Sequence, residues 1–366
     1  MGKKVQFPKL FNAETYEPCT FDYDAKPDES QEKKIGRESW VKIFKDSNEE
    51  FRRRAMNDRT VENSKEKSEK FNREFLAYLD DLLEQRDPDM NVIKMCRFRD
   101  ECLRKNGFED CFEKVKREEN EKALEALPRV LKKLDEERAT ILEYVKGVFA
   151  GNIFDLGAAA SQALFSDEEE DGENIETSFF ETRDTKTNTF VVDDFKLLQK
   201  RWNDLDDVHR KCCIFVDNAG ADIILGVLPL ARAMLKRGTK VVLCANDVPS
   251  INDITIKELR ELVFPRLLEM GDEVFKNAIE MGTLSCCGSG NDMPVIDLRE
   301  ISEECAEVCS DCDLIVLIGM GRGIETNLKT EFTIDRMNLG MVKHPEVAEL
   351  LGGELYSSVC KFDLAK

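Results

Sequence analysis

The sequence predicts an α/β fold, with a Rossmann-like, mostly parallel three-layer sheet that follows an all-helical N-terminal domain. Two observations carry this prediction. From Cys212 onward, short apolar runs alternate with helical patterns, which is typical of a parallel sheet with helices on both faces. Residues 36–165 instead repeat their apolar residues at helix spacing and contain few strand-like runs. The length of 366 residues is sufficient for two domains.

The strands of the α/β part are expected where short apolar runs end at turn-forming residues. Six are expected, at 212–216, 240–244, 283–287, 313–318, 337–342 and 356–362. Helices should precede, separate or follow them, at 193–202, 221–236, from 253 onward and at 302–312. The chain should therefore divide into four parts: an extended lead-in (1–35), a helical domain (36–165), an acidic linker (166–192) and an α/β domain (193–366).

Apolar residues in the N-terminal half lie on one helix face at spacings of three and four. Examples are Phe71, Phe75 and Leu79, and further on Leu127 and Leu131. Pro128 interrupts the second pattern, so we expect either a kink or a helix break there.

Composition narrows the class of protein. The chain carries 54 basic and 74 acidic residues, a net charge of -20, which argues against nucleic acid or an anionic membrane as partner. A small phosphorylated metabolite remains compatible, because local cations or a metal can hold one phosphate. The N-terminus shows no secretory or membrane segment, and the 13 cysteines are typical of reduced thiols in a cytoplasmic protein, which could form a homo-oligomer. Only two histidines occur, which disfavours histidine-rich zinc sites and a Ser-His-Asp triad.

Polar side chains follow two successive strands. Asp217 and Asn218 come directly after the strand at 212–216, and Asp253 lies shortly after the next one. Ligands of open α/β sheets bind at the carboxyl ends of the strands, and carboxylate and amide oxygens suit Mg²⁺ or Mn²⁺. Asp and Asn also favour turns, and Asp253 also suits the start of a helix, so each residue alone has a purely structural interpretation.

A glycine-rich segment and a lysine follow two later strands. Gly319 and Gly321 would let backbone amides approach an anion, Arg322 could grip two phosphate oxygens, and Lys343 could act as a point charge. A dinucleotide-binding fingerprint is an alternative, but its third glycine would fall on Ile324.

Five segments in this order resemble the metal-dependent damage-control phosphatases, once called domain of unknown function 89. They are 151–157 (Gly-Asn-Ile-Phe-Asp-Leu-Gly), 217–222 (Asp-Asn-Ala-Gly-Ala-Asp), 252–255 (Asn-Asp-Ile-Thr), 319–322 (Gly-Met-Gly-Arg) and Lys343. The Gly-Met-Gly-Arg form resembles the subfamily fused to, or acting beside, pantothenate kinases. The resemblance implies a divalent ion (Mn²⁺, Co²⁺, Mg²⁺ or Ni²⁺) and hydrolysis of small phosphomonoesters, with 4′-phosphopantetheine or its oxidised, damaged forms as the expected substrate.

The resemblance also implies roles for the residues that match its motifs. Asp217, Asn218 and Asp253 would hold the metal and be catalytic, which would make 193–366 the metal-binding catalytic domain. Six residues would contact the substrate: Asn152, Asp155, Gly319, Gly321, Arg322 and Lys343.

Other functions remain open on the residues alone. A Rossmann-like sheet with acidic strand ends also fits an S-adenosylmethionine-dependent methyltransferase, and a sugar-phosphate phosphatase or a non-catalytic scaffold are further alternatives. A haloacid-dehalogenase mechanism is disfavoured, because it needs an aspartate where Ala219 stands. Cys305, Cys309 and Cys312 match the spacing of a radical iron–sulfur motif, but the same spacing places them on one helix face, so we predict buried thiols and no iron–sulfur cluster.

Overall fold

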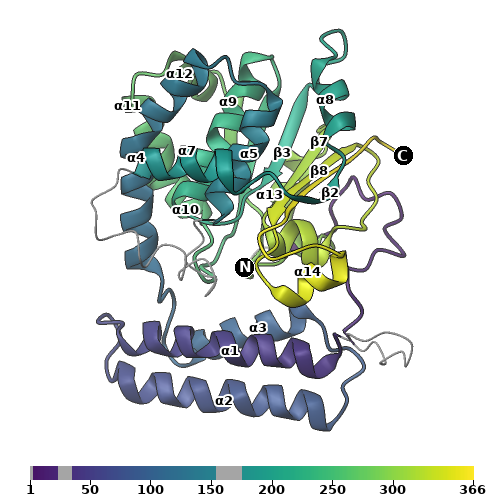
Figure 1. Ribbon diagram of the computed structural model, residues 1–366. Coiled ribbons are helices and arrows are strands. Elements are labelled where there is room, and N and C mark those ends of the chain that lie inside the picture. Colours follow the sequence, from purple (N-terminus) through teal and green to yellow (C-terminus); the bar gives the residue numbers. More distant parts are fainter. Residues whose placement is uncertain (1–2, 24–34, 154–174) are drawn as a thin grey trace.

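The computed structural model describes residues 3–23, 35–153 and 175–366 (Figure 1). Asp155 and the acidic run at 166–172 lie outside these ranges. Within the described ranges, no helix combines the length and the apolar character needed to cross a membrane.

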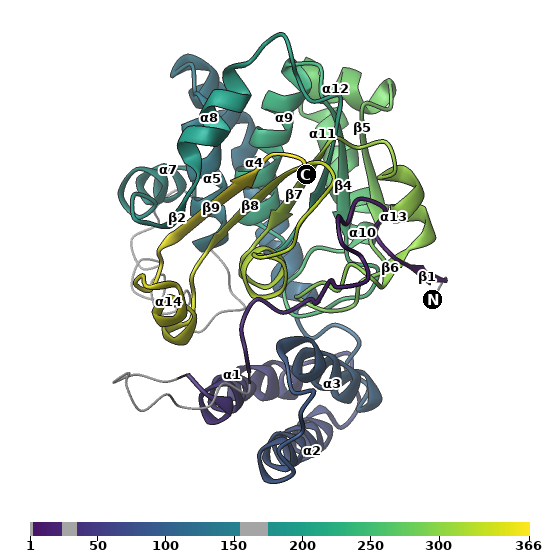
Figure 2. The same cartoon turned by 90° about the vertical axis from the view of Figure 1, so that its right-hand side faces the viewer.

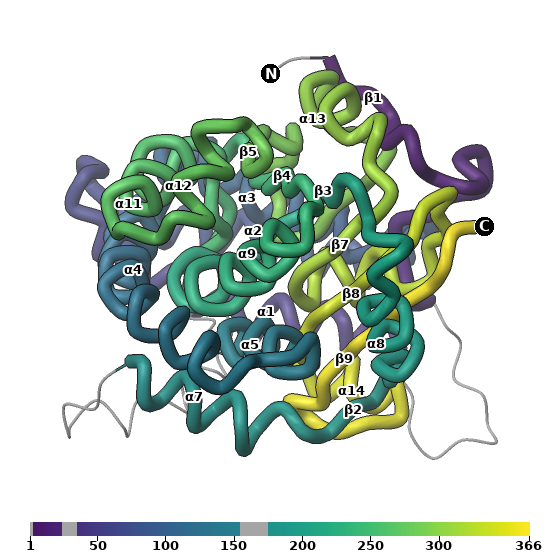
Figure 3. The backbone as a smooth tube through the Cα atoms, turned by 90° about the horizontal axis from the view of Figure 1, so that it is seen from above, coloured from purple at the N-terminus to yellow at the C-terminus, as the bar shows by residue number. Residues whose placement is uncertain are grey.

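The centre of the molecule is a seven-stranded sheet in the order β2-β9-β8-β7-β3-β4-β5, which Figure 3 shows from above. All neighbouring strands are parallel except β8 and β9. The strands are β2 (Phe190–Asp193), β3 (Lys211–Phe215), β4 (Lys240–Ala245), β5 (Leu284–Gly288), β7 (Leu314–Ile318), β8 (Asp335–Met341) and β9 (Ser358–Asp363). This confirms the predicted mostly parallel sheet.

One strand and one helix occupy the segment that we expected to be a linker. Strand β2 pairs in parallel with β9 at the edge of the sheet, and α7 (Ile175–Thr185) precedes it. Four residues are too short to show the alternation that identifies a strand from sequence. Helix α7 buries Phe179 and Phe180 in the core beneath the sheet, although its other faces are polar.

Helices α4, α5, α9, α11 and α12 cover one face of the sheet (Figure 3). Within this layer, α5 lies very close to the start of η2, and glycine makes this approach possible. A Cβ on Gly151 of α5 would lie 2.7 Å from the carbonyl oxygen of Ala221, just before η2. The elements of this layer are α4 (Glu113–Glu136), α5 (Ile141–Ile153), the π-helical turn η2 (Asp222–Val227), α9 (Leu228–Lys236), α11 (Phe264–Glu269) and α12 (Glu273–Glu280).

The opposite face is covered by α13 (Glu303–Val308) and by the N-terminal segment, whose β1 (Lys4–Val5) pairs with β6 (Ile301–Ser302). The ring of Phe7 packs edge-on against Phe215 of β3. The first part of the expected lead-in is therefore a layer of the α/β core, whereas Tyr23 packs against Trp40 of the helical layer described next.

Helices α1 (Arg37–Met56), α2 (Ser64–Glu84) and α3 (Val92–Lys105) form a separate layer beyond one end of the sheet (Figures 1 and 2). Trp40, Phe71 and Phe75 build its core. The helices expected at 36–165 thus fall into two groups, because α4 and α5 share their core with the sheet. Pro128 lies inside α4, which continues past it.

The remaining elements connect strands or lie at the edges. They are α8 (Phe195–Asn203), α10 (Ile256–Glu258), η3 (Leu259–Val263), η4 (Met320–Thr326) and α14 (Pro345–Leu351). The π-helical segments η2, η3 and η4 each overlap or follow one of the polar segments singled out in the sequence, and π-turns are frequent at functional sites.

Candidate active site

The site lies where the strand order reverses. From β3 the chain continues to β4 and β5 on one side, then returns to β7 on the other side of β3. A crevice opens at such a point beyond the carboxyl ends of the strands. Asp217 follows β3 and Gly319 follows β7, and a Cβ on Gly319 would lie 1.9 Å from Oδ2 of Asp217. Gly319 also has φ +89, so only glycine suits this position.

The backbone amide of Gly319 forms a hydrogen bond with a neighbouring strand. Its N–H donates to the carbonyl oxygen of Leu339 at 2.8 Å, so it is already engaged within the protein. Gly321 lines the pocket described below. Of the two glycines predicted to approach a phosphate, Gly321 is therefore the one that borders the pocket.

Asp217, Asn218 and Asp253 come together, as the sequence predicted. Asn218 and Asp253 pair as an antiparallel bridge, and Ile254 N donates to Asp217 O at 3.0 Å. The side chain of Asp253 is completely buried. Helix α4 supports this loop, because Lys116 Nζ lies 3.4 Å from the carbonyl oxygen of Asp253.

Arg322 lies between the two carboxylates. One terminal nitrogen donates to Asp217 Oδ1 and to the carbonyl oxygen of Pro294, and the other donates to Asp253 Oδ2 at 2.6 Å and to Asn246 Oδ1 at 2.9 Å. Both terminal nitrogens of the fork are thus engaged within the protein, and Arg322 is only 2% exposed. This differs from the predicted phosphate fork: the guanidinium here holds the carboxylates in place.

Asn152 of α5 reaches the same cluster. Its Nδ2 donates to Asp222 Oδ2 at 2.8 Å and to Asp217 Oδ2 at 3.3 Å. Asn218 Nδ2 also donates to both carboxylates, at 3.0 Å each. Burial, reinforced by the negative charge of Asp217, raises the pKa of Asp222 to about 7, whereas Lys343 opposes the shift. Asp222 was part of the quoted motif but had no predicted role.

A pocket of about 390 Å³ opens onto these residues. Its floor includes Asp217, Asn218, Gly321 and the buried Lys343. Its opposite wall comes from the helical layer and is largely apolar, with Trp40, Ile43, Phe44, Phe51 and Val92. A polar floor facing an apolar wall is typical of a small-molecule site.

Two further charged residues of the pocket lining are buried and were not predicted. Arg99 of α3 donates through Nε to Asp100 Oδ1 at 2.7 Å, and its guanidinium lies 4.6 Å from the centroid of the Phe51 ring. One of its terminal nitrogens is buried and has no hydrogen-bond partner among the described residues. Glu325 lies one helical turn after Arg322, and burial together with the charge of Asp217 raises its pKa to about 7.

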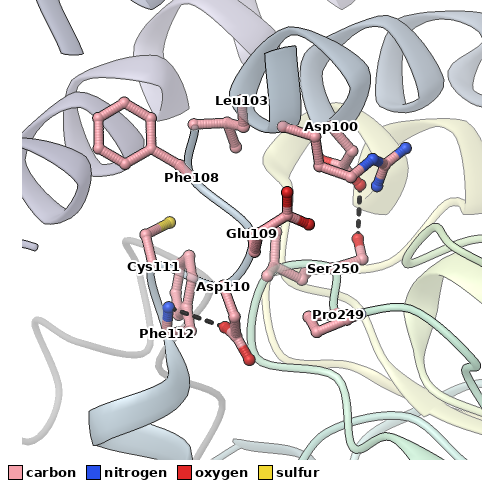
Figure 4. Close-up of a pocket in the computed structure, with 11 residues that line it drawn as sticks. Asp100, Leu103, Phe108, Glu109, Asp110, Cys111, Phe112, Pro249 and Ser250 are labelled. Carbon is pink, nitrogen blue, oxygen red and sulfur yellow. Dashed lines mark hydrogen bonds between the residues drawn. The ribbon is translucent and has the colours of Figure 1, made fainter. Parts of the chain in front are cut away.

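The helical layer is tied directly to the loop that carries Asp253. Figure 4 shows the junction, where Ser250 Oγ donates to Asp100 Oδ2 at 2.6 Å. The carbonyl oxygen of Ser250 in turn accepts from Asp253 N at 3.0 Å. The pocket drawn there has a volume of about 20 Å³, enough for a water molecule but not for a substrate. Arg99 is thereby fixed relative to the carboxylates by a short chain of contacts.

The donor set fits a hard divalent cation. Two aspartates and an asparagine offer oxygen ligands in one buried cluster, and one oxygen of the neighbouring Asp222 is buried without a hydrogen-bond partner among the described residues. Arginine is the cation that balances the two carboxylates in this arrangement.

Comparison with known proteins identifies the family of the chain. Residues 36–359 match the damage-control phosphatase ARMT1-like domain. A damage-control phosphatase of Arabidopsis thaliana is 41% identical over 99% of this chain and 98% of its own length. The 4′-phosphopantetheine phosphatase of Mus musculus is 29% identical over 98% of this chain and 48% of its own length. The crystal structure of a DUF89 family protein from Pyrococcus horikoshii shares the fold, with a TM-score of 0.61 and 19% identity over 89% of this chain and 97% of that one.

The chain therefore belongs to the damage-control phosphatase family, whose phosphatases are metal-dependent, and it is a hydrolase.

Proposed function

We propose that this protein hydrolyses small phosphomonoesters with the help of a divalent ion, Mn²⁺, Co²⁺, Mg²⁺ or Ni²⁺, and that its substrate is 4′-phosphopantetheine or an oxidised, damaged form of it. The main support is the convergence of Asp217 and Asn218, which line a pocket together with Lys343, with the buried Asp253 behind them. The name of the mouse relative supports the substrate.

Asp217, Asn218 and Asp253 would hold the ion, which supplies Lewis-acid polarisation of a phosphoryl oxygen. The side chains around them set the geometry. Arg322 fixes one oxygen of each aspartate, and Asn152 fixes the second oxygen of Asp217. Such preorganisation lowers the barrier because no group has to reorient as charge develops.

Lys343 would neutralise the phosphate. It is buried at the pocket floor of a protein whose net charge is -20, so local positive charge is needed to admit a phosphate dianion. Asp155, the other residue predicted to line the pocket from the helical side, lies outside the described residues, so its role stays a prediction.

The two walls of the pocket fit the two ends of the proposed substrate. The phosphate would lie at the polar floor, and the pantetheine arm would extend along Trp40, Phe44 and Phe51. Arg99 offers a buried donor on this wall, suited to a carbonyl oxygen of the arm or to an oxidised sulfur group at its end.

A phosphate-release assay with each of the four metal ions tests the proposal. The substrates should be 4′-phosphopantetheine, its sulfonate form, a hexose phosphate and a short alkyl phosphate. We expect the first two to give the highest kcat/KM, and we expect a chelator to abolish the activity. Preference for the hexose phosphate would contradict the proposed substrate, and activity that persists in chelator would contradict the proposed metal dependence.

A further inference from the structure

Six buried cysteines meet on the sheet face opposite α5. Three come from strands (Cys213 of β3, Cys244 of β4 and Cys287 of β5), and three from α13 and the residues that follow it (Cys305, Cys309 and Cys312). All are free thiols and almost completely inaccessible to solvent. The sequence suggested only the helical three, because the strand cysteines are far apart along the chain.

Four of these sulfurs surround one point. Cys244 and Cys287 are register partners on adjacent strands, and their sulfurs lie 3.7 Å apart. Cys309 Sγ is 3.8 Å from Cys244 Sγ and 4.0 Å from Cys305 Sγ, and it interacts with Cys287 as well. The sulfurs of Cys244, Cys287 and Cys305 lie within 4.8 Å of one another.

These distances match the edges of a tetrahedron around a single ion. With a Zn–S bond of about 2.3 Å, two ligands of a tetrahedral zinc ion lie about 3.8 Å apart. Thiols packed as small hydrophobes can also touch in pairs, but pairwise packing does not require four of them to converge. An iron–sulfur cluster places its cysteines on different iron atoms and so needs wider spacing than these sulfurs have.

From this geometry we infer that Cys244, Cys287, Cys305 and Cys309 form a structural zinc site, separate from the oxygen cluster at the strand ends. Each thiol would lose its proton to water as the ion binds during folding, giving a four-thiolate site with no open position. Thiolate ligands favour zinc over the hard ions proposed for the active site.

The surroundings define the limits of the set. Cys213 donates to the carbonyl oxygen of Leu314 at 3.6 Å, whereas the corresponding contact of Cys244, to Val242, is 4.0 Å. Cys213 and Cys312 flank the site, and their sulfurs also lie within 4.8 Å of that of Cys309. Lys211 interacts electrostatically with Cys309 and Cys312 and lies 2.6 Å from the carbonyl oxygen of Val308, so a cation stands beside the buried negative charge.

The proposed zinc would join α13 to β4 and β5. Cys244 lies two residues before Asn246, whose amide donates to Asp253 at 2.9 Å and whose oxygen accepts from Arg322. The ion would therefore stabilise the strand end from which the active-site loop departs, without contacting substrate.

The test is the metal content of the full-length protein after exhaustive dialysis against a chelator, which removes ions from oxygen sites. We expect one zinc per chain, with X-ray absorption showing four sulfur ligands at about 2.3 Å. Cys287→Ser should lose the zinc and melt at lower temperature. Cys212→Ser is the matched control, because Cys212 is equally buried on β3 but packs in the core on the other face, and it should keep the zinc.

If Cys287→Ser does not fold, titration of the wild-type protein with a mercurial should release one zinc per chain into a colorimetric indicator. Wild-type protein without stoichiometric zinc, with iron or copper in its place, or with oxygen or nitrogen ligands around the zinc would overturn the proposal. None of these results depends on phosphatase activity.

Discussion

Neighbouring strands of the sheet carry two donor clusters of different chemistry, and β4 takes part in both. Beyond the ends of β3 and β4, Asp217, Asn218 and Asp253 form an oxygen cluster, and the first two of them line a pocket. On one face of β4, Cys244 meets Cys287 and the cysteines of α13 in a closed core. Structural metal sites are closed and catalytic sites keep an open position. Both clusters are buried, but only the oxygen cluster borders the pocket described above.

The comparison shows what each location permits. Residues beyond a strand end are free of the sheet's hydrogen-bond pattern, so charged side chains can turn toward one another and toward a ligand. Residues within the sheet are fixed by register, and only uncharged side chains such as thiols are accepted there without a partner. Four predictions test this division. Three concern activity, from the largest expected effect to the smallest, and the last concerns stability.

Replacing Asp217 should impair the oxygen cluster and leave the sulfur site unchanged. Asp217→Asn keeps the shape but removes the charge that pairs with Arg322 and would bind the active-site ion. We expect phosphatase activity to fall by at least about 10³-fold, more than the loss of one hydrogen-bond donor. The content of chelator-resistant zinc should not change. Asp247→Asn is the matched control, because Asp247 likewise follows a strand of the sheet, β4, but lies outside the pocket. Activity of Asp217→Asn within a few-fold of wild type would contradict the site assignment.

Lys343 tests whether the pocket floor binds phosphate. Lys343→Ala should lower kcat/KM by on the order of 10²–10³, because a contact to a phosphoryl oxygen strengthens as charge develops. Binding of Mn²⁺, measured by calorimetry, should be retained. Lys361→Ala provides the comparison, since Lys361 forms its ion pairs with Asp194 and Asp363 on β9, away from the pocket. Near-normal hydrolysis by Lys343→Ala with metal still bound would exclude this lysine from the site.

Arg99 tests whether the helical layer recognises the arm of the substrate. Arg99→Gln removes a charged donor, and hydrogen bonds to charged groups contribute about 1.5–3 kcal/mol, so KM for 4′-phosphopantetheine should rise roughly 10- to 100-fold. Hydrolysis of a short alkyl phosphate should change little, because it does not reach that wall. Arg97→Gln on the same helix, which pairs with Glu300 at the surface, should behave as wild type. An equal loss with both substrates would assign Arg99 to general stability instead.

The sequence was sufficient to predict the parts of the site that depend on local pattern. Asp217 and Asn218 end a buried strand, and Asp253 follows the next one, so their convergence at one sheet edge could be predicted. Arg99 could not be found in this way, because nothing local relates α3 to strand ends more than 100 residues later.

Residues were harder to interpret when their partners depend on the fold. The role of Arg322 depends on two carboxylates that are distant in sequence, and the need for glycine at 319 depends on the position of Asp217. The cysteines of α13 were recognised as one helix face, but their partners follow from the register of β4 and β5. Strand β2 was missed because four residues carry too little periodicity.

The last prediction concerns stability rather than activity, and it uses Glu325, a buried acid beside the oxygen cluster. Its pKa rises from 4.5 in the unfolded chain to about 7 in the fold, first because of burial and then because of Asp217. The contribution of Glu325 to the free energy of unfolding is therefore fully present below pH 4.5. It is lost as the pH rises through about 7, by up to roughly 3 kcal/mol. Glu325→Gln removes this loss, so in chelator it should raise the melting temperature at pH 8 and have little effect at pH 4.5. Glu331→Gln, at an exposed position, should show no such pH dependence. A gain for Glu325→Gln that is equal at both pH values would show that packing, rather than ionisation, limits the site.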